Sequence, residues 1–312
     1  MNTQAEPAIE KFPNKLAIYF AATRPPFILA TIIPILLGFA YGHYHGFEIN
    51  WLYSFLAVLA GIFLHAGVNV LNDYYDALNG TDDFNEERIY PFTGGSRFIQ
   101  NEVLSRSQTR DFGLGLIAAV VLIGLYLVLH VGANLLLPLG LFGIFIGWAY
   151  SAPPLQLNSR GLGELTVLVG FGLLPLGAWL IQTGSFSLSV VLIALPLGAL
   201  ISNLLYINQF PDRKADIQAK KMHWVARLPI SVSRWGYWII SGFAWLLIIV
   251  FVAKGLLPTL SLISLAPIVL SFIAGMELLK YSDQPHKLEV AIKMTILTML
   301  SHGILLIISL LF

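Results

Sequence analysis

Nine apolar segments, each close to the length of a membrane span, constrain this chain more than any other feature. A helix needs about 20 mostly apolar residues to cross a bilayer. Of the 312 residues, 57% are hydrophobic and 11% are charged, whereas a soluble domain carries roughly 25% charged residues. We therefore predict one all-α domain, 1–312, built as a polytopic membrane helical bundle with nine transmembrane helices. The predicted spans are 20–42, 51–72, 111–131, 134–151, 162–182, 187–209, 235–253, 257–279 and 289–311.

The uneven distribution of basic residues predicts how the bundle is oriented. Lys and Arg concentrate in cytoplasmic loops. With nine spans, 17 of the 18 basic residues fall on one side of the membrane, and only Lys254 falls on the other. The sequence thus predicts a cytoplasmic N-terminus with a short arm over 1–16, long cytoplasmic loops, and a C-terminus on the far side.

Net charge and cysteine content exclude several classes of function. The formal net charge is +1, so no overall field attracts nucleic acid. The chain has no cysteine, which excludes a disulfide framework, a thiolate metal site and a cysteine nucleophile. The first residues, Met1 to Asn14, lack the basic and then apolar pattern of a signal peptide.

Two acidic motifs of the same form end the second and sixth predicted spans. The first is Asn72-Asp73-Tyr74-Tyr75-Asp76, and the second runs from Asn208 through Asp212 to Asp216. Both contain Asn-x-x-x-Asp, both end an apolar segment, and both precede a basic loop. This correspondence predicts two related four-helix halves, about 17–151 and 160–280, followed by a final helix. Because both copies lie on the same predicted side, the repeat is parallel rather than inverted.

The spacing within each motif points to a site for a hard cation. Residues four apart share one face of a helix, so Asn69, Asp73 and Asp76 form one stripe, with His65 one turn away. Asn208, Asp212 and Asp216 form another, although Pro211 is expected to kink or end that helix. Two facing stripes of oxygen ligands suit Mg²⁺, which also binds substrate phosphates. The alternative is that these carboxylates are solvated caps at the level of the lipid headgroups.

Basic residues near both motifs suggest a partner for the cation. Arg97 follows the flexible segment 93–96, and Lys220, Lys221 and Arg227 follow the second motif. A diphosphate needs Lys or Arg in addition to Mg²⁺. The alternative is that these side chains only reflect the preference for positive charge in cytoplasmic loops.

Together these motifs resemble the UbiA superfamily of membrane prenyltransferases over nearly the whole chain. The resemblance rests on 72–82, on Tyr150-Ser151-Ala152-Pro153-Pro154-Leu155 with Arg160-Gly161-Leu162-Gly163-Glu164, on 208–216, and on Arg24-Pro25. The segment Thr93-Gly94-Gly95-Ser96-Arg97 resembles the dihydroxynaphthoate, or menaquinone-pathway, type. Two departures stand out. Asn158 replaces a frequent Lys, and Lys220-Lys221-Met222-His223 replaces Gly-Lys-x-Thr.

The resemblance implies Mg²⁺-dependent transfer of a prenyl chain from an allylic polyprenyl diphosphate to an aromatic acceptor, 1,4-dihydroxy-2-naphthoate. The tail would lie in an apolar tunnel open to membrane lipid, and the protein would sit in the inner or plasma membrane of a prokaryote. The implied metal ligands are Asp73, Asp76, Asp82, Asp212 and Asp216. The implied diphosphate ligands are Asn72, Arg97, Asn208, Lys214, Lys221 and Arg227, and the implied catalytic residues are Asp76, Arg97, Asp212 and Lys221.

Several alternatives remain at the level of sequence. Other acceptors of the superfamily are 4-hydroxybenzoate, homogentisate, haem, chlorophyllide and a glycerol-ether lipid. A secondary transporter would place its carboxylates near the bilayer midplane, and a non-catalytic binding scaffold would not need them for turnover. His65 either contacts substrate or is an ordinary core histidine.

Overall fold

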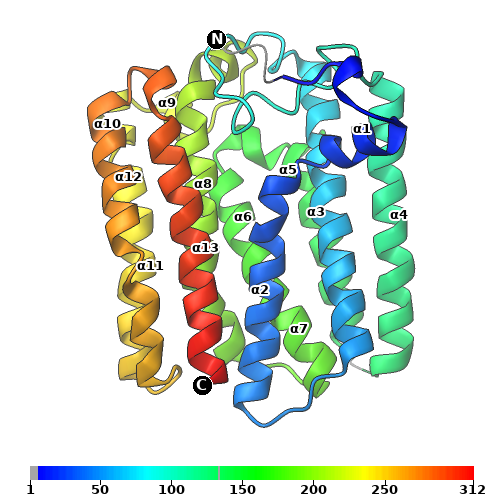
Figure 1. Cartoon of the computed structure of the whole chain (residues 1–312), viewed down its shortest axis with the longest axis vertical. Coiled ribbons are helices and arrows are strands. Elements are labelled where there is room, and N and C mark those ends of the chain that lie inside the picture. The colour runs from blue at the N-terminus through cyan, green and yellow to red at the C-terminus, as the bar shows by residue number, and fades with distance from the viewer. Residues whose placement is uncertain (1–5, 133) are drawn as a thin grey trace.

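The computed structural model describes residues 6–312 except 133, so residues 1–5 of the predicted arm lie outside the described part. The described chain is a bundle of helices (Figure 1). The helices are α1 (Lys15–Ala22), α2 (Pro25–Tyr44), α3 (Trp51–Asn79), α4 (Arg106–Val131), α5 (Leu136–Ser151), α6 (Gly163–Gly172), α7 (Leu174–Thr183), α8 (Leu188–Gln218), α9 (Trp224–Arg227), α10 (Ile230–Ser233), α11 (Gly236–Ala253), α12 (Ile268–Tyr281) and α13 (Glu289–Leu311). Short 3₁₀ turns are η2 (Ile9–Lys11), η3 (Leu157–Arg160), η4 (Thr259–Leu265) and η5 (Pro285–Lys287).

Eight helical stretches of the described chain are long and apolar enough to cross a membrane. They are Pro25–Tyr44, Trp51–Asn79, Arg106–Val131, Gly163–Thr183, Leu188–Gln218, Ile230–Ala253, Thr259–Tyr281 and Glu289–Leu311. The remaining predicted span, 134–151, is the 16-residue helix α5. At 1.5 Å per residue α5 extends about 24 Å, less than the ~30 Å hydrocarbon core. The membrane bundle is therefore confirmed with eight candidate spans, and the count of nine stays a prediction.

Two prolines of the bundle have different effects on their helices. The predicted span 162–182 is divided at Leu173 into α6 and α7, and Pro175 lies in the first turn of α7, where its missing N–H leaves no donor unpaired. Pro211 was expected to kink or end the second motif helix, but α8 continues through it to Gln218, so an end at Pro211 is wrong. Membrane helices tolerate an internal proline where neighbouring groups satisfy the freed carbonyl.

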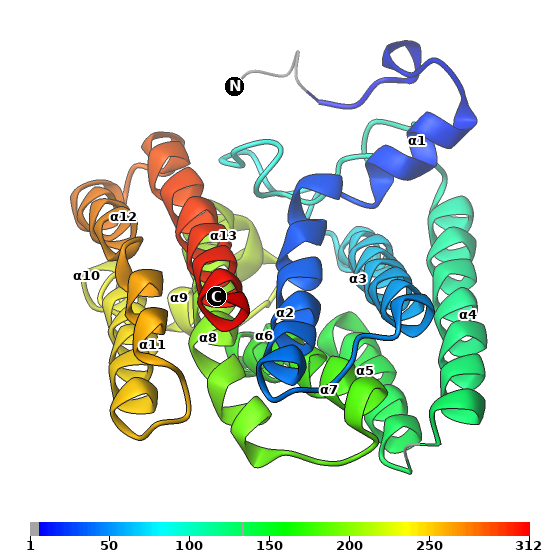
Figure 2. The same cartoon turned by 60° about the horizontal axis from the view of Figure 1, so that its bottom comes forward.

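The arrangement of the helices is clearest in the oblique view of Figure 2, in which the bottom of Figure 1 comes forward. The helices α3, α4 and α5 lie on one side, α11 and α12 lie on the other, and α2, α8 and α13 lie between them. The helix α8 packs against α6, α11 and α13, and α2 packs against α7, α13 and α3. In both predicted halves the motif helix packs along the next long helix, α3 against α4 and α8 against α11. The relation between the halves remains a prediction.

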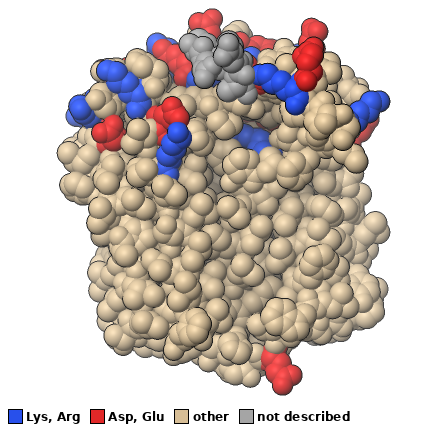
Figure 3. All heavy atoms as spheres, in the orientation of Figure 1, with Lys and Arg blue, Asp and Glu red and all other residues tan. Residues whose placement is uncertain are grey.

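Charged side chains gather at one end of the molecule in Figure 3, and the body of the bundle in that view is almost free of them. The same end carries α1 and the long loop between α3 and α4 (Figure 1). Because charge is costly in hydrocarbon, this end must lie at a water-facing membrane surface.

Candidate active site

One large cavity runs through the bundle from the charged end toward the opposite end. Its volume is about 500 Å³, and helices α2 to α8 all contribute to its wall. On α3 the lining residues extend from Ala57 to Asp76, which is about 28 Å along the helix at 1.5 Å per residue. The loop end of the cavity is polar, whereas the far end is lined by apolar side chains such as Leu127, Leu136 and Ile181.

The first motif presents two of its carboxylates differently. Asp76 lines the cavity and is buried, with its Oδ2 accepting from Asn72 at 3.2 Å. Asn72 also donates to Ser151 Oγ at 2.8 Å, which fixes its side chain against the end of α5. Asp73 is buried behind the wall, and its Oδ1 accepts from the backbone N–H of Ser96 at 3.2 Å. Asp73 therefore holds the loop that follows α3.

The second motif places both of its carboxylates on the cavity wall. Asp212 Oδ1 accepts from Asn85 Nδ2 at 2.6 Å. Asp216 Oδ2 lies 2.8 Å from His223 Nε2. The other ring nitrogen, Nδ1, accepts from the backbone N–H of Ala226, so Nε2 carries the proton of a neutral His223 and donates to Asp216. The two bonds together orient the ring.

Each motif is completed by a side chain from the loop that follows the other motif. Asn85, after the first motif, binds Asp212 of the second. Lys221, after the second motif, donates to both oxygens of Asp76 at 3.0 Å and lies 3.8 Å from Asp216. Burial alone would lower the pKa of the Lys221 ammonium, but the carboxylates of Asp76 and Asp216 outweigh it and raise the pKa. The two motifs thus meet as one charged site, with Lys221 ionised between them.

Asp82 occupies a confined position in the same site. Its side chain is buried and lines the cavity, and its Oδ2 has no hydrogen-bond partner within the described chain. Gly95, with φ of +73°, lies against it, and a Cβ there would be 2.8 Å from Asp82 Cγ. Burial raises the pKa of the Asp82 carboxyl well above its usual range, and the charges of Asp76 and Asp73 raise it further. A carboxylate in such surroundings favours a cation beside it.

Mg²⁺ fits the donor set of this site. The buried acceptor oxygens that have no hydrogen-bond donor among residues 6–312 other than 133 include four around the two motifs, namely Asp82 Oδ2, Asn85 Oδ1, Asn208 Oδ1 and Asp216 Oδ1. Unpaired buried oxygens in a native site call for a donor or an ion, and carboxylate and amide oxygens are what Mg²⁺ binds. No three His, Asp or Glu side chains of the described chain form a complete metal cluster. Phosphate oxygens and water would have to supply the rest of the coordination.

Three predicted basic residues lie away from the cavity wall. Arg97 is buried behind Asp82, where it donates to the Asp82 carbonyl oxygen and lies 4.0 Å from Glu6. Lys214 is exposed and forms an ion pair with Glu87. The exposed Arg227 donates to the carbonyl oxygen of Arg160 at 2.9 Å. Of the predicted basic residues, the structure brings Lys221 alone onto the wall, and Asn72 and Asn208 lie there with it.

Several residues of the site had no sequence-based role. Asn85 and His223 complete the two motifs, and Arg24, the residue before Pro25, lines the cavity near its mouth. Glu6 is buried and accepts from Arg88 Nε at 2.8 Å, so the end of the N-terminal arm packs onto the loop that carries Gly95. Two signals were available in the sequence. Arg24 belongs to the Arg24-Pro25 pair that contributes to the family resemblance, and His223 lies seven residues after Asp216, within the segment that departs from the usual motif.

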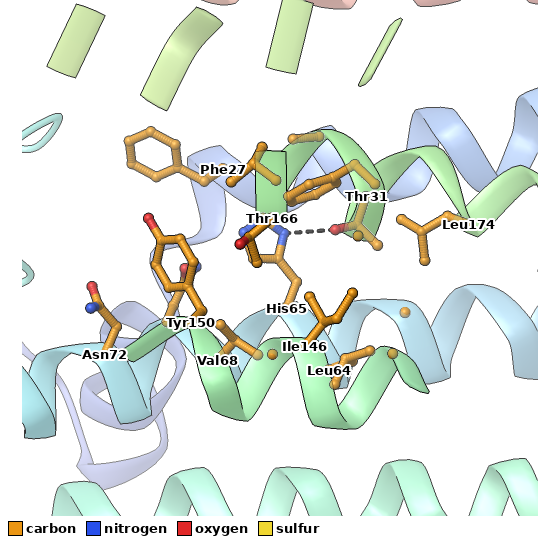
Figure 4. A pocket seen from close by; sticks show the side chains of 18 of the residues that line it. Phe27, Thr31, Leu64, His65, Val68, Asn72, Ile146, Tyr150, Thr166 and Leu174 are labelled. Atoms are coloured by element: carbon orange, nitrogen blue, oxygen red, sulfur yellow. Dashed lines mark hydrogen bonds between the residues drawn. The ribbon is translucent and has the colours of Figure 1, made fainter. Parts of the chain in front are cut away.

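The middle of the cavity holds a histidine among aromatic and apolar side chains. His65 Nδ1 lies 2.7 Å from Thr31 Oγ1, and the imidazole meets the Phe171 ring edge to face at 5.3 Å. In Figure 4, Asn72 and Tyr150 lie to one side of His65, and Leu64, Ile146 and Leu174 lie to the other. His65 thus lines the cavity rather than the packed core.

Comparison with known protein families and sequences gives a consistent result. The model of the UbiA prenyltransferase family matches residues 31–297. A 1,4-dihydroxy-2-naphthoate octaprenyltransferase of Haemophilus influenzae is 31% identical over 224 residues, which are 69% of this chain and 70% of that protein. A 2-carboxy-1,4-naphthoquinone phytyltransferase of Synechocystis is 27% identical over 222 residues, 69% of this chain and 67% of that protein.

Solved structures show the same fold at lower identity. A UbiA homologue of Archaeoglobus fulgidus, bound to DMAPP and Mg²⁺, superposes with a TM-score of 0.66 at 15% identity, covering 93% of this chain and 98% of that chain. A digeranylgeranylglyceryl phosphate synthase superposes with a TM-score of 0.62 at 20% identity, covering 95% and 99%.

Proposed function

The chain belongs to the UbiA prenyltransferase family, and on that premise we propose that it transfers a prenyl chain from an allylic polyprenyl diphosphate to 1,4-dihydroxy-2-naphthoate. Membrane-bound prenyl transfer follows from the family itself, and relatives that act on naphthoate or naphthoquinone rings support an aromatic acceptor. One observation carries the proposal for this chain's own residues. Two acidic motifs and Lys221 meet at the polar head of a long apolar cavity.

The polar head is suited to a diphosphate that arrives with Mg²⁺. Asp76, Asp82, Asp212 and Asp216 would hold the ion, with Asn72 and Asn208 beside them, and Asp73 would hold the loop. Homologues of this fold have been solved with Mg²⁺ and DMAPP and with Mg²⁺ and GPP, which supports this assignment. When bound, Mg²⁺ would offset the negative charge of the diphosphate oxygens.

The chemistry begins with loss of the diphosphate. The bond between the allylic carbon and the diphosphate oxygen breaks, and the leaving group keeps the electron pair. The ammonium of Lys221 lies where this negative charge develops and stabilises it. A ring π-electron pair of the acceptor then forms the bond to the allylic carbon. The ring regains its aromaticity by losing a proton from the substituted carbon, or carbon dioxide where that carbon carries the carboxylate. The apolar wall excludes water, which would otherwise capture the allylic cation.

The apolar part of the cavity is suited to the isoprenoid tail. The lining residues on α3 extend over about 28 Å, from Asp76 to Ala57. Val121, Leu125, Leu137 and Leu141 line the cavity and are more than a third exposed, which supports an opening of the cavity between α4 and α5. Through such an opening a long tail would leave the cavity sideways, into the lipid.

The naphthoate acceptor is supported by the relatives in which it is named. Several proteins about 25–31% identical to this chain are 1,4-dihydroxy-2-naphthoate octaprenyltransferases. An assay of membranes with labelled prenyl diphosphates and the panel of acceptors tests this directly. Transfer to 4-hydroxybenzoate or homogentisate with none to dihydroxynaphthoate would replace the proposed acceptor.

We also propose that the site faces the cytoplasm of a prokaryotic cell, with the C-terminus on the far side of the membrane. The charged end in Figure 3 is the end at which the motifs and the long loops lie. The excess of Lys and Arg in those loops supports a cytoplasmic position.

Substitution of the motif carboxylates tests the site. Asp76→Asn and Asp212→Asn keep the side-chain shape but remove the charge, and each is expected to lower transfer at least a hundredfold while the protein still folds. The matched control is Asp283→Asn, because Asp283 is exposed outside the cavity. Transfer within twofold of the unaltered protein in either motif variant would remove that residue from the site.

A further inference from the structure

A polar pair lies deeper in the cavity than the groups that would bind a diphosphate. His65 of α3 and Thr31 of α2 are joined by a 2.7 Å hydrogen bond, and both line the cavity. His65 precedes Asn72 by seven residues, so it lies on the same helix face about 10 Å further along the axis. That separation is close to the length of a bicyclic aromatic ring with one carbon beyond it.

One nitrogen of His65 remains available to a ligand. Thr31 occupies Nδ1, and within the described chain Nε2 has no hydrogen-bond partner. A neutral imidazole has one donor and one acceptor nitrogen, so Nε2 either donates to a ligand oxygen or accepts from a hydroxyl. Because an unpaired polar atom in an apolar cavity is costly, a ligand that pairs with Nε2 binds better than one that does not.

The position of the pair divides the cavity into two chemically different parts. Toward the motifs the lining includes Asn69, Asn72, Tyr150 and Thr166. Beyond His65 and Thr31 the lining side chains are apolar, as with Ile35, Ile181 and Leu174. A hydrocarbon tail gains nothing from a polar group at this boundary, whereas an aromatic ring that carries hydroxyl groups does.

The walls beside His65 are suited to a flat ring. Phe171 meets the imidazole at an interplanar angle of 80°, and Phe27 and Tyr150 also line this part of the cavity. Figure 4 shows Phe27, Tyr150 and His65 around the same space. Aromatic rings pack favourably against one another in offset or edge-to-face arrangements.

We propose that His65, held by Thr31, binds a ring hydroxyl of the aromatic acceptor and thereby orients the ring toward the allylic carbon. This inference rests on the proposed prenyl transfer and assigns the acceptor's half of that site. It makes His65 a specificity-determining residue, which would distinguish hydroxylated aromatic acceptors from rings that lack a hydroxyl at that position.

The test compares dihydroxynaphthoate with its two mono-O-methyl ethers in the unaltered protein, His65→Ala, His65→Gln and Thr31→Val. In the unaltered protein one ether should lose about tenfold in kcat/KM, the value of one hydrogen bond. In His65→Ala that loss should shrink to less than twofold, while KM for the acceptor rises and KM for the prenyl diphosphate stays constant. His65→Gln, which keeps a polar terminus, should restore part of the discrimination, and Thr31→Val should weaken it.

The control is His43→Ala, because His43 of α2 is exposed outside the cavity, and its kinetics should match those of the unaltered protein. Unchanged discrimination between dihydroxynaphthoate and its ethers in His65→Ala would overturn the role of His65. Equal changes in both KM values would do the same, since they indicate a general structural effect. A different failure, no transfer by the unaltered protein to any hydroxylated aromatic acceptor, would overturn the proposed function itself.

Discussion

Gly95 provides the sharpest test of the metal site, because it touches Asp82 without being a ligand itself. Its φ is +73°, a region that favours glycine. A Cβ at this position would overlap Asp82 Oδ2, its nearest neighbour, and would lie 2.8 Å from both Cγ and Oδ1, whereas ordinary contact begins at 3.4 Å. In Gly95→Ala the Asp82 carboxylate must therefore move by at least about 0.6 Å. Misplacement of a reacting group by about 1 Å costs on the order of a hundredfold in rate.

We expect Gly95→Ala to lower prenyl transfer about tenfold or more and to raise the Mg²⁺ concentration needed for half-maximal rate. The control is Gly184→Ala, since Gly184 has φ of +68° but a Cβ there would meet nothing within 4 Å. Both variants carry the cost of a left-handed alanine, about 1–2 kcal/mol. Gly95→Ala adds the cost of displacing the buried Asp82 carboxylate, so it should lose more thermal stability than Gly184→Ala. Initial rates over a Mg²⁺ titration, with melting curves in detergent, separate the two effects. Normal Mg²⁺ dependence and a rate within twofold in Gly95→Ala would refute the assigned role of Asp82.

Three further predictions follow from other parts of the molecule. His223→Asn keeps an N-cap for α9 but cannot reach Asp216, so its transfer rate should need more Mg²⁺ while its stability is nearly retained. His223→Ala should lose about 1 kcal/mol more free energy of unfolding than His223→Asn. Equal melting temperatures of the two variants would contradict this. Gly124 lines the cavity, and a Cβ there would meet nothing within 4 Å, so Gly124→Leu should fold. Relative to the unaltered protein, its activity with long prenyl diphosphates should fall at least tenfold more than its activity with DMAPP. An equal fall with both donors would refute the proposed path of the tail. A reporter enzyme that works only outside the cytoplasm should be active when it is fused after Phe312, and one that works only in the cytoplasm should be inactive there. The opposite result would reverse the proposed orientation.

The bundle was predictable because its physical cause is local. Runs of about 20 apolar residues specify membrane helices without reference to the rest of the chain, and eight such stretches of the structure overlap predicted spans. The two motif helices continue beyond their predicted ends at 72 and 209, to Asn79 and Gln218. Two prolines differ in their effect on the helices. Pro175 lies in the first turn of α7, whereas α8 continues through Pro211 to Gln218. Membrane helices tolerate an internal proline where neighbouring groups satisfy the freed carbonyl, which depends on tertiary contacts that the local sequence does not encode.

The site was predictable only where residues share a helix face. The stripe of Asn208, Asp212 and Asp216 follows from spacing alone, and all three residues line the cavity. In the first stripe Asn69 and Asp76 line the cavity, but Asp73 lies behind its wall, so its predicted place on the same face is wrong. Lys221 and Asn85 join the two motifs. The direction of a loop side chain depends on distant contacts that spacing does not encode. Arg97 is held by Glu6 and by the Asp82 carbonyl oxygen, so a basic residue placed near the motif by sequence lies behind it in space.

The packing of Glu6 onto the loop between α3 and α4 limits how far the N-terminal arm can be shortened. Glu6 accepts from Arg88 and Asn101 and lies 4.0 Å from Arg97, so the start of the chain fastens the segment that carries Gly95 and Ser96. Shortening the chain past Glu6 would leave the largely buried guanidinium groups of Arg88 and Arg97 without their carboxylate, and breaking a buried ion pair in this way costs about 3–5 kcal/mol. A shortened form of the protein should therefore keep Glu6.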